Sequence, residues 1–166
     1  MLTAQETRRE VTRATTPQDD SEANSDKVPE VYAISGQFSK VVVLRFKYQA
    51  DLLAGIEKIV KEQGIKNAVI LAGAGSVTGF HIHQVTNRTF PSKNTYVKNP
   101  TAAADIISMN GYVIDGKVHA HMTMATPERA FGGHLEPDTK VFTFAIVTIG
   151  IMNDADFSHL DDKTYR

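Results

Sequence analysis

Residues 117–124 read Lys-Val-His-Ala-His-Met-Thr-Met and form the most informative stretch of the chain. Polar and apolar side chains alternate along it, and a β-strand turns successive side chains to opposite faces. The alternation therefore predicts a strand with His119 and His121 side by side on its polar face. Val118, Ala120 and Met122 lie on the other face, which can pack into a core.

Two imidazoles on one strand face can bind the same metal ion, and His134 is the best candidate for a third ligand. It follows Gly132 and Gly133, a pair that lets the backbone turn sharply or approach another chain closely, and we expect a turn here to bring His134 to the other two histidines. Three histidines on zinc leave the fourth position open, as in catalytic rather than structural sites. The pattern predicts a divalent-metal site, with zinc as first choice, at His119, His121 and His134. A solvated strand face is the alternative.

The other three histidines give a weaker signal. His81 and His83 form a second His-x-His pair on a strand expected over 80–86, but the sequence identifies no third partner for them, so their role is left open. His159 lies in a polar C-terminal segment, where we expect solvent around it.

Strand and helix signals alternate through the rest of the chain. Strands are expected over 41–46, 68–72, 80–86, 104–113, 118–124 and 141–151. Leu52, Ile56 and Val60 recur at helical spacing between Asp51, a candidate N-cap, and Gly64, a candidate C-cap. Many strands and one helix predict an α+β domain, a largely antiparallel sheet packed with a helix.

Glycine, proline and polar residues mark the expected connections and tails. Residues 73–76, Gly-Ala-Gly-Ser, lack the lysine of a phosphate-binding loop and predict a turn between strands. Residues 87–100 predict a long loop. Residues 1–29 contain no Phe or Tyr and predict a disordered polar tail. A single domain is expected over 30–152, followed by a polar C-terminal tail over 153–166.

The composition excludes several classes of protein. A chain of 166 residues without cysteine forms no disulfides and no thiolate zinc site. It has no apolar run of about 18 residues and no secretory-type segment, so we expect a cytoplasmic protein with no membrane partner. The formal net charge of −1 gives no general reason to bind a polyanion, so direct nucleic-acid binding is not expected and no DNA-binding residue is assigned.

Three charged residues are candidates for a catalytic role. Arg45 stands within a β-branched run, where a charge calls for a partner or an anionic ligand. Glu128 and Glu136 flank the segment that carries His134 and are suited to moving a proton. Solvated surface charges are the alternative for all three.

With these residues in place, the chain resembles bacterial members of the plant and prokaryote conserved (PPC) domain family, whose members often carry a DNA-binding label. The resemblance rests on Val118-His119-Ala120-His121, a variable loop and Gly132-Gly133-His134-Leu135, placed after Arg45 and the Gly-x-Gly-Ser segment. It covers about residues 31–151 and implies an α+β fold similar to acetolactate decarboxylase, assembled as a homotrimer. It also implies that His119, His121 and His134 bind a metal, often zinc.

The chain departs from the family at two places. Residues 48–51, Tyr-Gln-Ala-Asp, replace a more acidic start of the helix, and Arg8-Arg9 lacks the glycine and proline of the Arg-Gly-Arg-Pro hook with which plant relatives enter DNA. A homotrimer is also expected because residues 141–151 are apolar on both faces and one helix covers only one of them. Two functions stay open: a metal-dependent enzyme or binder of a small anionic molecule, and a trimeric DNA-associated or protein-interaction module without catalysis.

Overall fold

The structure is a computed structural model that describes residues 8–13 and 26–160. In this part of the chain, nine strands form one sheet in the order β1-β5-β4-β8-β7-β6-β3-β9-β2, and every neighbouring pair is antiparallel. The strands are β1 Arg8–Arg13, β2 Lys40–Lys47, β3 Ala68–Val77, β4 Phe80–Val85, β5 Asn94–Asn99, β6 Ala104–Ile114, β7 Lys117–Ala125, β8 Ala130–Leu135 and β9 Val141–Ile151. The predicted α+β class with a largely antiparallel sheet and one helix is confirmed.

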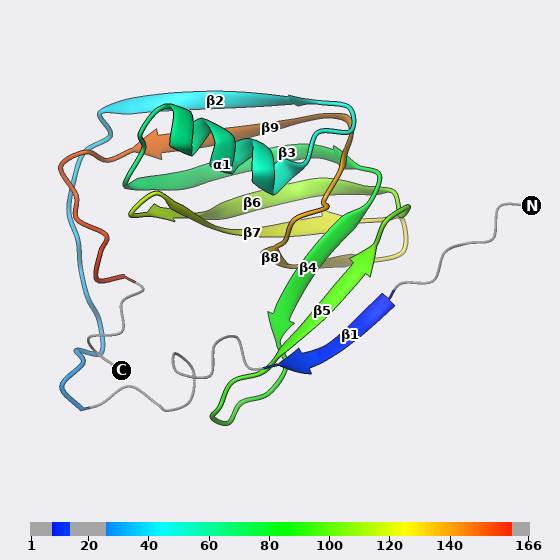
Figure 1. The fold of residues 1–166 in the computed structure, drawn as a ribbon, viewed down its shortest axis with the longest axis horizontal. Coiled ribbons are helices and arrows are strands. Elements are labelled where there is room, and N and C mark those ends of the chain that lie inside the picture. The colour runs from blue at the N-terminus through cyan, green and yellow to red at the C-terminus, as the bar shows by residue number, and fades with distance from the viewer. Residues whose placement is uncertain (1–7, 14–25, 161–166) are drawn as a thin grey trace, which may run out of the picture.

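Figure 1 shows how the sheet is arranged. Strands β2, β9, β3, β6 and β7 lie side by side behind the single helix α1, whereas β4, β5 and β1 swing away from them as an arm. Strand β8 joins the two parts because it pairs with β7 on one side and β4 on the other. Among the described residues, no helix is long and apolar enough to cross a membrane.

Helix α1 (Leu52–Glu62) begins and ends near the expected caps. The Asp51 side chain accepts a hydrogen bond from the backbone N–H of Ala54 at 3.0 Å, as an N-cap does. Gly64 follows the last turn with φ of +62°, a left-handed conformation that glycine adopts without strain. Leu52 and Ile56 are completely buried, so the helix covers one face of the sheet and closes the core.

The opposite face of the sheet is left uncovered by α1. On β2 and β9, side chains alternate between the two faces, so Leu44 and Val147 are buried. Five large apolar side chains of these two strands are exposed on the other face, which we call the apolar face: Val41, Val43, Phe142, Phe144 and Ile146. Monomeric proteins seldom leave large contiguous apolar patches exposed to water.

Two predicted connections are wrong. Residues 73–76 do not turn but continue β3, and the chain reverses only after Val77. Gly75 has φ of +149°, and a Cβ there would meet the backbone of Ala145 at 2.6 Å, so this glycine allows close approach of β9 rather than a turn. Within 87–100, the predicted loop, β5 pairs along its whole length with β4. The residues at its two ends, Asn94 and Asn99, are buried. Asparagine is more common in loops than in strands, so the polar composition of this segment predicted a loop.

The tails also differ from expectation where the structure describes them. Residues 8–13, predicted to be disordered, form β1 and pair with the outer edge of β5. An unpaired strand edge presents free backbone N–H and C=O groups, so it can order a polar segment that has no core of its own. The rest of the predicted disorder over 1–25 lies outside the described residues. In the C-terminal segment, Ala155 and Phe157 are buried, and the Phe157 ring packs edge-on against Tyr112.

Candidate metal centre

Strand β7 presents the two histidines as its sequence predicts. His119 and His121 lie on the uncovered face, while Ala120 and Met122 are 1% and 3% exposed on the face toward the core. The Nε2 atoms of His119 and His121 are 3.3 Å apart. Two nitrogens bound to one tetrahedral zinc, with Zn–N bonds of 2.0–2.1 Å, lie about 3.3 Å apart, so this spacing suits a shared ion.

The third histidine reaches them on a strand and not through a turn. Gly132 and Gly133 belong to β8, and His134 lies directly opposite His121 in the pairing of β8 with β7. A Cβ on Gly132 would collide with the carbonyl oxygen of Met122, and one on Gly133 with that of His83. The glycine pair therefore lets the strands close tightly, which is the second of the two roles considered for it.

The three histidines form a compact donor set. One ring nitrogen from each of His119, His121 and His134 lies within 4.8 Å of the others. The His134 ring stands edge-on to both partners, with ring centroids 4.7 Å from His119 and 5.1 Å from His121. Neutral imidazole nitrogens are ligands for zinc, copper, nickel and iron, so the residues present fit a divalent transition metal.

The surroundings of His134 and His121 favour the neutral form of these two imidazoles, which is the form that binds metal. Burial, together with the neighbouring His83, His119 and His121, lowers the pKa of His134 to about 4. The pKa of His121 is also lowered, again mainly by burial and then by His119 and His83. A proton is the main competitor of a metal for an imidazole nitrogen, so a lowered pKa favours the ligand form at neutral pH.

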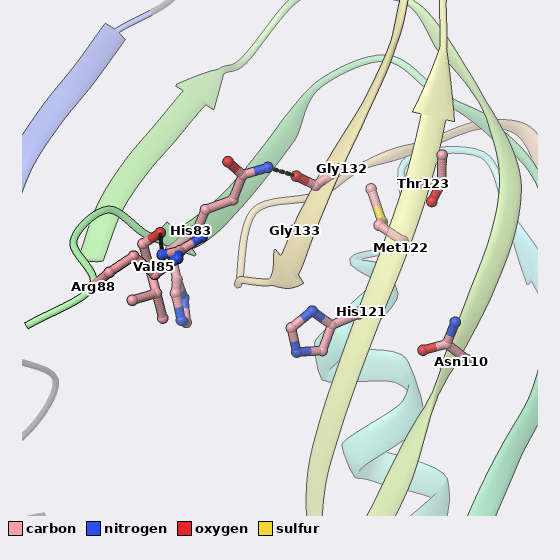
Figure 2. A pocket seen from close by; sticks show the side chains of 10 residues that line it. His83, Val85, Arg88, Asn110, His121, Met122, Thr123, Gly132 and Gly133 are labelled. Atoms are coloured by element: carbon pink, nitrogen blue, oxygen red, sulfur yellow. Dashed lines mark hydrogen bonds between the residues drawn. The ribbon is translucent and has the colours of Figure 1, made fainter. Parts of the chain in front are cut away.

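A fourth histidine, His83, lies beside this donor set, although no partner for it could be identified from the sequence. His83 on β4 lies opposite His134, which lies opposite His121, so one row of imidazoles crosses three strands. The His83 and His134 rings are 4.5 Å apart, and Figure 2 shows His83 and His121 on either side of the β8 glycines. The His-x-His spacing places His83 on a polar strand face, but only the strand order reveals what lies beside it.

Glu136 is the candidate acid that the structure brings to the centre. His83 Nδ1 donates a hydrogen bond to Glu136 Oε1 at 2.5 Å, and their side chains are 15% and 20% exposed. Burial acts to raise the pKa of Glu136, but the hydrogen bond and the nearby imidazoles outweigh it and hold the pKa below its usual range. Glu136 is therefore a carboxylate beside His83 and His134.

The other candidates lie away from the three histidines. Arg45 is exposed on β2, a strand at the edge of the sheet. Strands β9, β3 and β6 lie between β2 and β7, so the backbones of β2 and β7 are roughly 19 Å apart at about 4.8 Å per strand. Glu128 lies in the turn between β7 and β8, beyond the Ala125–Ala130 pair, where its carboxylate accepts a hydrogen bond from Thr126 Oγ1. Neither residue can act at this centre within one chain.

His81 and His159 do not belong to the candidate metal centre. His81 Nδ1 donates to the carbonyl oxygen of Pro137 at 3.0 Å, so this imidazole supports the segment after β8. His159 is exposed near the end of the described chain.

Two hollows open beside the centre. One, of about 490 Å³, includes His83, His121, Asn110 and Arg88 in its lining, and Figure 2 shows these side chains around it. Arg88 comes from the segment after β4, and its guanidinium donates to the carbonyl oxygens of Val85 and Asn87. The other hollow, of about 380 Å³, includes His119 and His134 in its lining. Small molecules could thus approach the histidines from two sides.

Fold and site together define a known class. Residues 33–153 match the Plants and Prokaryotes Conserved (PCC) domain, which is more than half of the chain. The chain belongs to this family, as the motif around His119, His121 and His134 predicts.

Solved structures agree on the fold. A hypothetical protein from Salmonella enterica has a TM-score of 0.59 at 21% identity, covering 73% of this chain and 81% of that one. A metal-containing protein from Archaeoglobus fulgidus has a TM-score of 0.58 at 22% identity, covering 73% and 86%. A plant- and prokaryote-conserved protein from Pyrococcus horikoshii has a TM-score of 0.56 at 23% identity, covering 75% and 84%.

Curated relatives match over a short part of their length. Two proteins named bifunctional protein GlmU, from two Synechococcus strains, are 25% and 24% identical over 124 residues. These matches cover 74% of this chain but only 19% and 18% of the relatives. The chain thus spans about a fifth of their length.

Proposed function

We propose that this protein binds one divalent metal ion, zinc by first choice, through His119, His121 and His134. The observation that carries the proposal is the donor set: three imidazole nitrogens from two paired strands, all within 4.8 Å of one another. The similar fold of a metal-containing protein supports it. A bound zinc with three protein ligands would polarise a carbonyl or activate water at its open position.

The proposed ligand is a small anionic molecule bound in the hollow beside the centre. A bound cation would be positive, as is the guanidinium of Arg88 in the lining, and the two positive charges together favour an anion. Arg88 thus takes the anion-binding role that the sequence suggests for Arg45. If the ligand reacts, Glu136 is placed to move a proton. The resemblance to acetolactate decarboxylase concerns the fold alone. It supports a small-molecule function in general and does not identify a reaction.

The proposed assembly is a homotrimer that buries the apolar face. Phe144 and Ile146 are 44% and 38% exposed on β9, and Val43 on the neighbouring β2 is 62% exposed. Burying apolar surface yields roughly 25 cal/mol per Å², so a second copy of the same chain would stabilise this face. We place the assembled protein in the cytoplasm.

An interaction module without catalysis is the second proposed function, and the same apolar face supports it. A protein partner, itself bound to DNA or not, could cover Phe142, Phe144 and Ile146 in place of a second copy. Direct DNA binding is not proposed, because the net charge of −1 offers no excess of lysine and arginine for phosphates.

Metal analysis followed by a ligand screen tests these proposals. The protein is purified without a metal-binding tag, supplied with zinc, dialysed and analysed for metal, and we expect one zinc per chain. Carboxylate and phosphate metabolites are then screened for a shift in melting temperature that depends on zinc. A chain that retains no metal after this treatment would show the metal proposal to be wrong.

A further inference from the structure

Two groups of potential metal ligands share His134, and only one of them is the three-histidine set. The second consists of His83, His134 and Glu136, whose ligand atoms also lie within 4.8 Å of one another. It lies on the β4 side of His134, whereas His119 and His121 lie on the β7 side. We propose that His83, His134 and Glu136 form a second position for a divalent transition metal, used in alternation with the first.

The donors of the second position suit such a cation. Two imidazoles and one carboxylate bind catalytic zinc in some enzymes and iron(II) in others, and both arrangements leave coordination positions open. His83 and Glu136 are only partly exposed, so water competes less for them than for surface side chains. The hydrogen bond between His83 Nδ1 and Glu136 Oε1, at 2.5 Å, holds the two side chains next to each other, and a metal bound by both atoms would replace its proton.

Charge and the shared ligand make the two positions alternatives. Each position needs the His134 ring, and the two groups together contain one carboxylate, that of Glu136. Two dications a few ångströms apart repel strongly in a partly buried site, and one negative charge does not offset that repulsion. We therefore expect a single ion per chain. The ion should bind preferentially at the three imidazoles and should bind at the second position when the first is removed.

The backbone keeps the second position in place without the metal. The Glu136 N–H donates to the carbonyl oxygen of His81 at 3.0 Å, and the Gln84 amide donates to the carbonyl oxygen of Gly132. Thr139, completely buried, donates its hydroxyl to the same His81 oxygen and accepts from the His81 N–H. These hydrogen bonds connect β4 to β8 and to the residues that follow β8. They hold His83 and Glu136 in place beside His134.

The test removes the first position and asks whether an ion still binds. It rests on the proposed metal function, so the parent protein is measured beside the variants by equilibrium dialysis against zinc and elemental analysis. We expect one zinc per parent chain and one, held more weakly, in His119→Ala/His121→Ala. Adding His83→Ala or Glu136→Gln to that double variant should abolish binding. Adding His81→Ala, the matched change two residues away on the same strand, should leave it unchanged.

Each other outcome contradicts a stated part of the inference. If the parent binds zinc and the double variant binds none, the second position does not exist, while the three-histidine centre stands. If the double variant keeps its zinc after His83→Ala, the second ligand set is wrong. Two zinc ions per parent chain would contradict alternation, and no zinc in the parent would overturn both metal proposals. Circular dichroism of each variant confirms that the sheet is retained.

Discussion

His134 on β8 lies directly opposite His121 on β7, and this single register pair brings together two of the three candidate metal ligands, which are thirteen positions apart in the sequence. In an antiparallel pair, directly opposed side chains point to the same face, with Cβ atoms about 4.5–5.5 Å apart. The third imidazole, His119, is two residues along β7 and shares that face. The pairing of two strands therefore builds the centre.

Replacing His134 with alanine should remove most of the bound zinc. The change takes one of three ligands and leaves Leu135, which is 1% exposed and packs in the core, in place. The fold should therefore persist while the zinc content measured by elemental analysis falls. An unchanged melting temperature of the metal-free form would show that the loss is local.

His159→Ala is the control for that experiment, because His159 is exposed and belongs to neither ligand group. Its zinc content should equal that of the parent. A His134→Ala variant that retains zinc at the parent level would contradict the assignment of the centre.

Acid should destabilise the metal-free protein between about pH 6.5 and pH 4. His134 has a pKa of about 4 when folded, against about 6.5 in an unfolded chain. Between these values the unfolded chain binds a proton that the folded chain does not, so the free energy of unfolding falls as the pH is lowered. Urea unfolding at pH 7.5 and pH 5 measures this loss. The loss should be smaller in His134→Gln, which cannot titrate, and equal losses would count against the neutral buried imidazole.

A charge on the apolar face should break the proposed trimer. Light scattering of the parent should give the mass of three 18.2 kDa chains. Val43→Asp would bury a carboxylate in the interface opposite Thr148, which carries no charge, so the variant should be a folded monomer. Lys58→Asp on the exposed side of α1 is the matched control and should remain trimeric. A monomeric parent at micromolar concentration would disprove the trimer.

Binding to AT-rich duplex DNA should stay in the non-specific range. Without a basic surface excess, we expect dissociation constants no tighter than about 10⁻⁴–10⁻⁶ M at physiological salt. Fluorescence anisotropy with an AT-rich and a GC-rich duplex measures this. Sub-micromolar binding that distinguishes the two sequences would favour the DNA-associated function over the small-molecule one.

Local patterns predicted most of the fold. The alternation of His119 to Met124 gave the correct faces of β7, and Asp51 and Gly64 gave the ends of α1. These features depend on neighbouring residues only, so they can be inferred from spacing. Strands β5 and β8 were missed because asparagines and glycines usually mark loops, yet here they lie where another strand approaches closely.

The candidate centre was predicted in part for the same reason. His119, His121 and His134 follow from a motif, and the structure brings their nitrogens together. His83 and its bond to Glu136 depend on β4 pairing with β8, a contact between residues more than fifty positions apart. No periodicity within one segment specifies such a pairing, so one sequence could not reveal it.

The glycine pair of β8 couples the position of His134 to the packing of Leu135 in the core. Gly132 and Gly133 have no side chains, so Phe131 and Leu135 alone hold that strand in step with its neighbours on the core side. A slip by one residue would exchange the positions of Leu135 and His134, exposing an apolar side chain and withdrawing a ligand. An ion bound at His134 would oppose such slippage, so we expect core mutations near Leu135 to change metal affinity as well as stability.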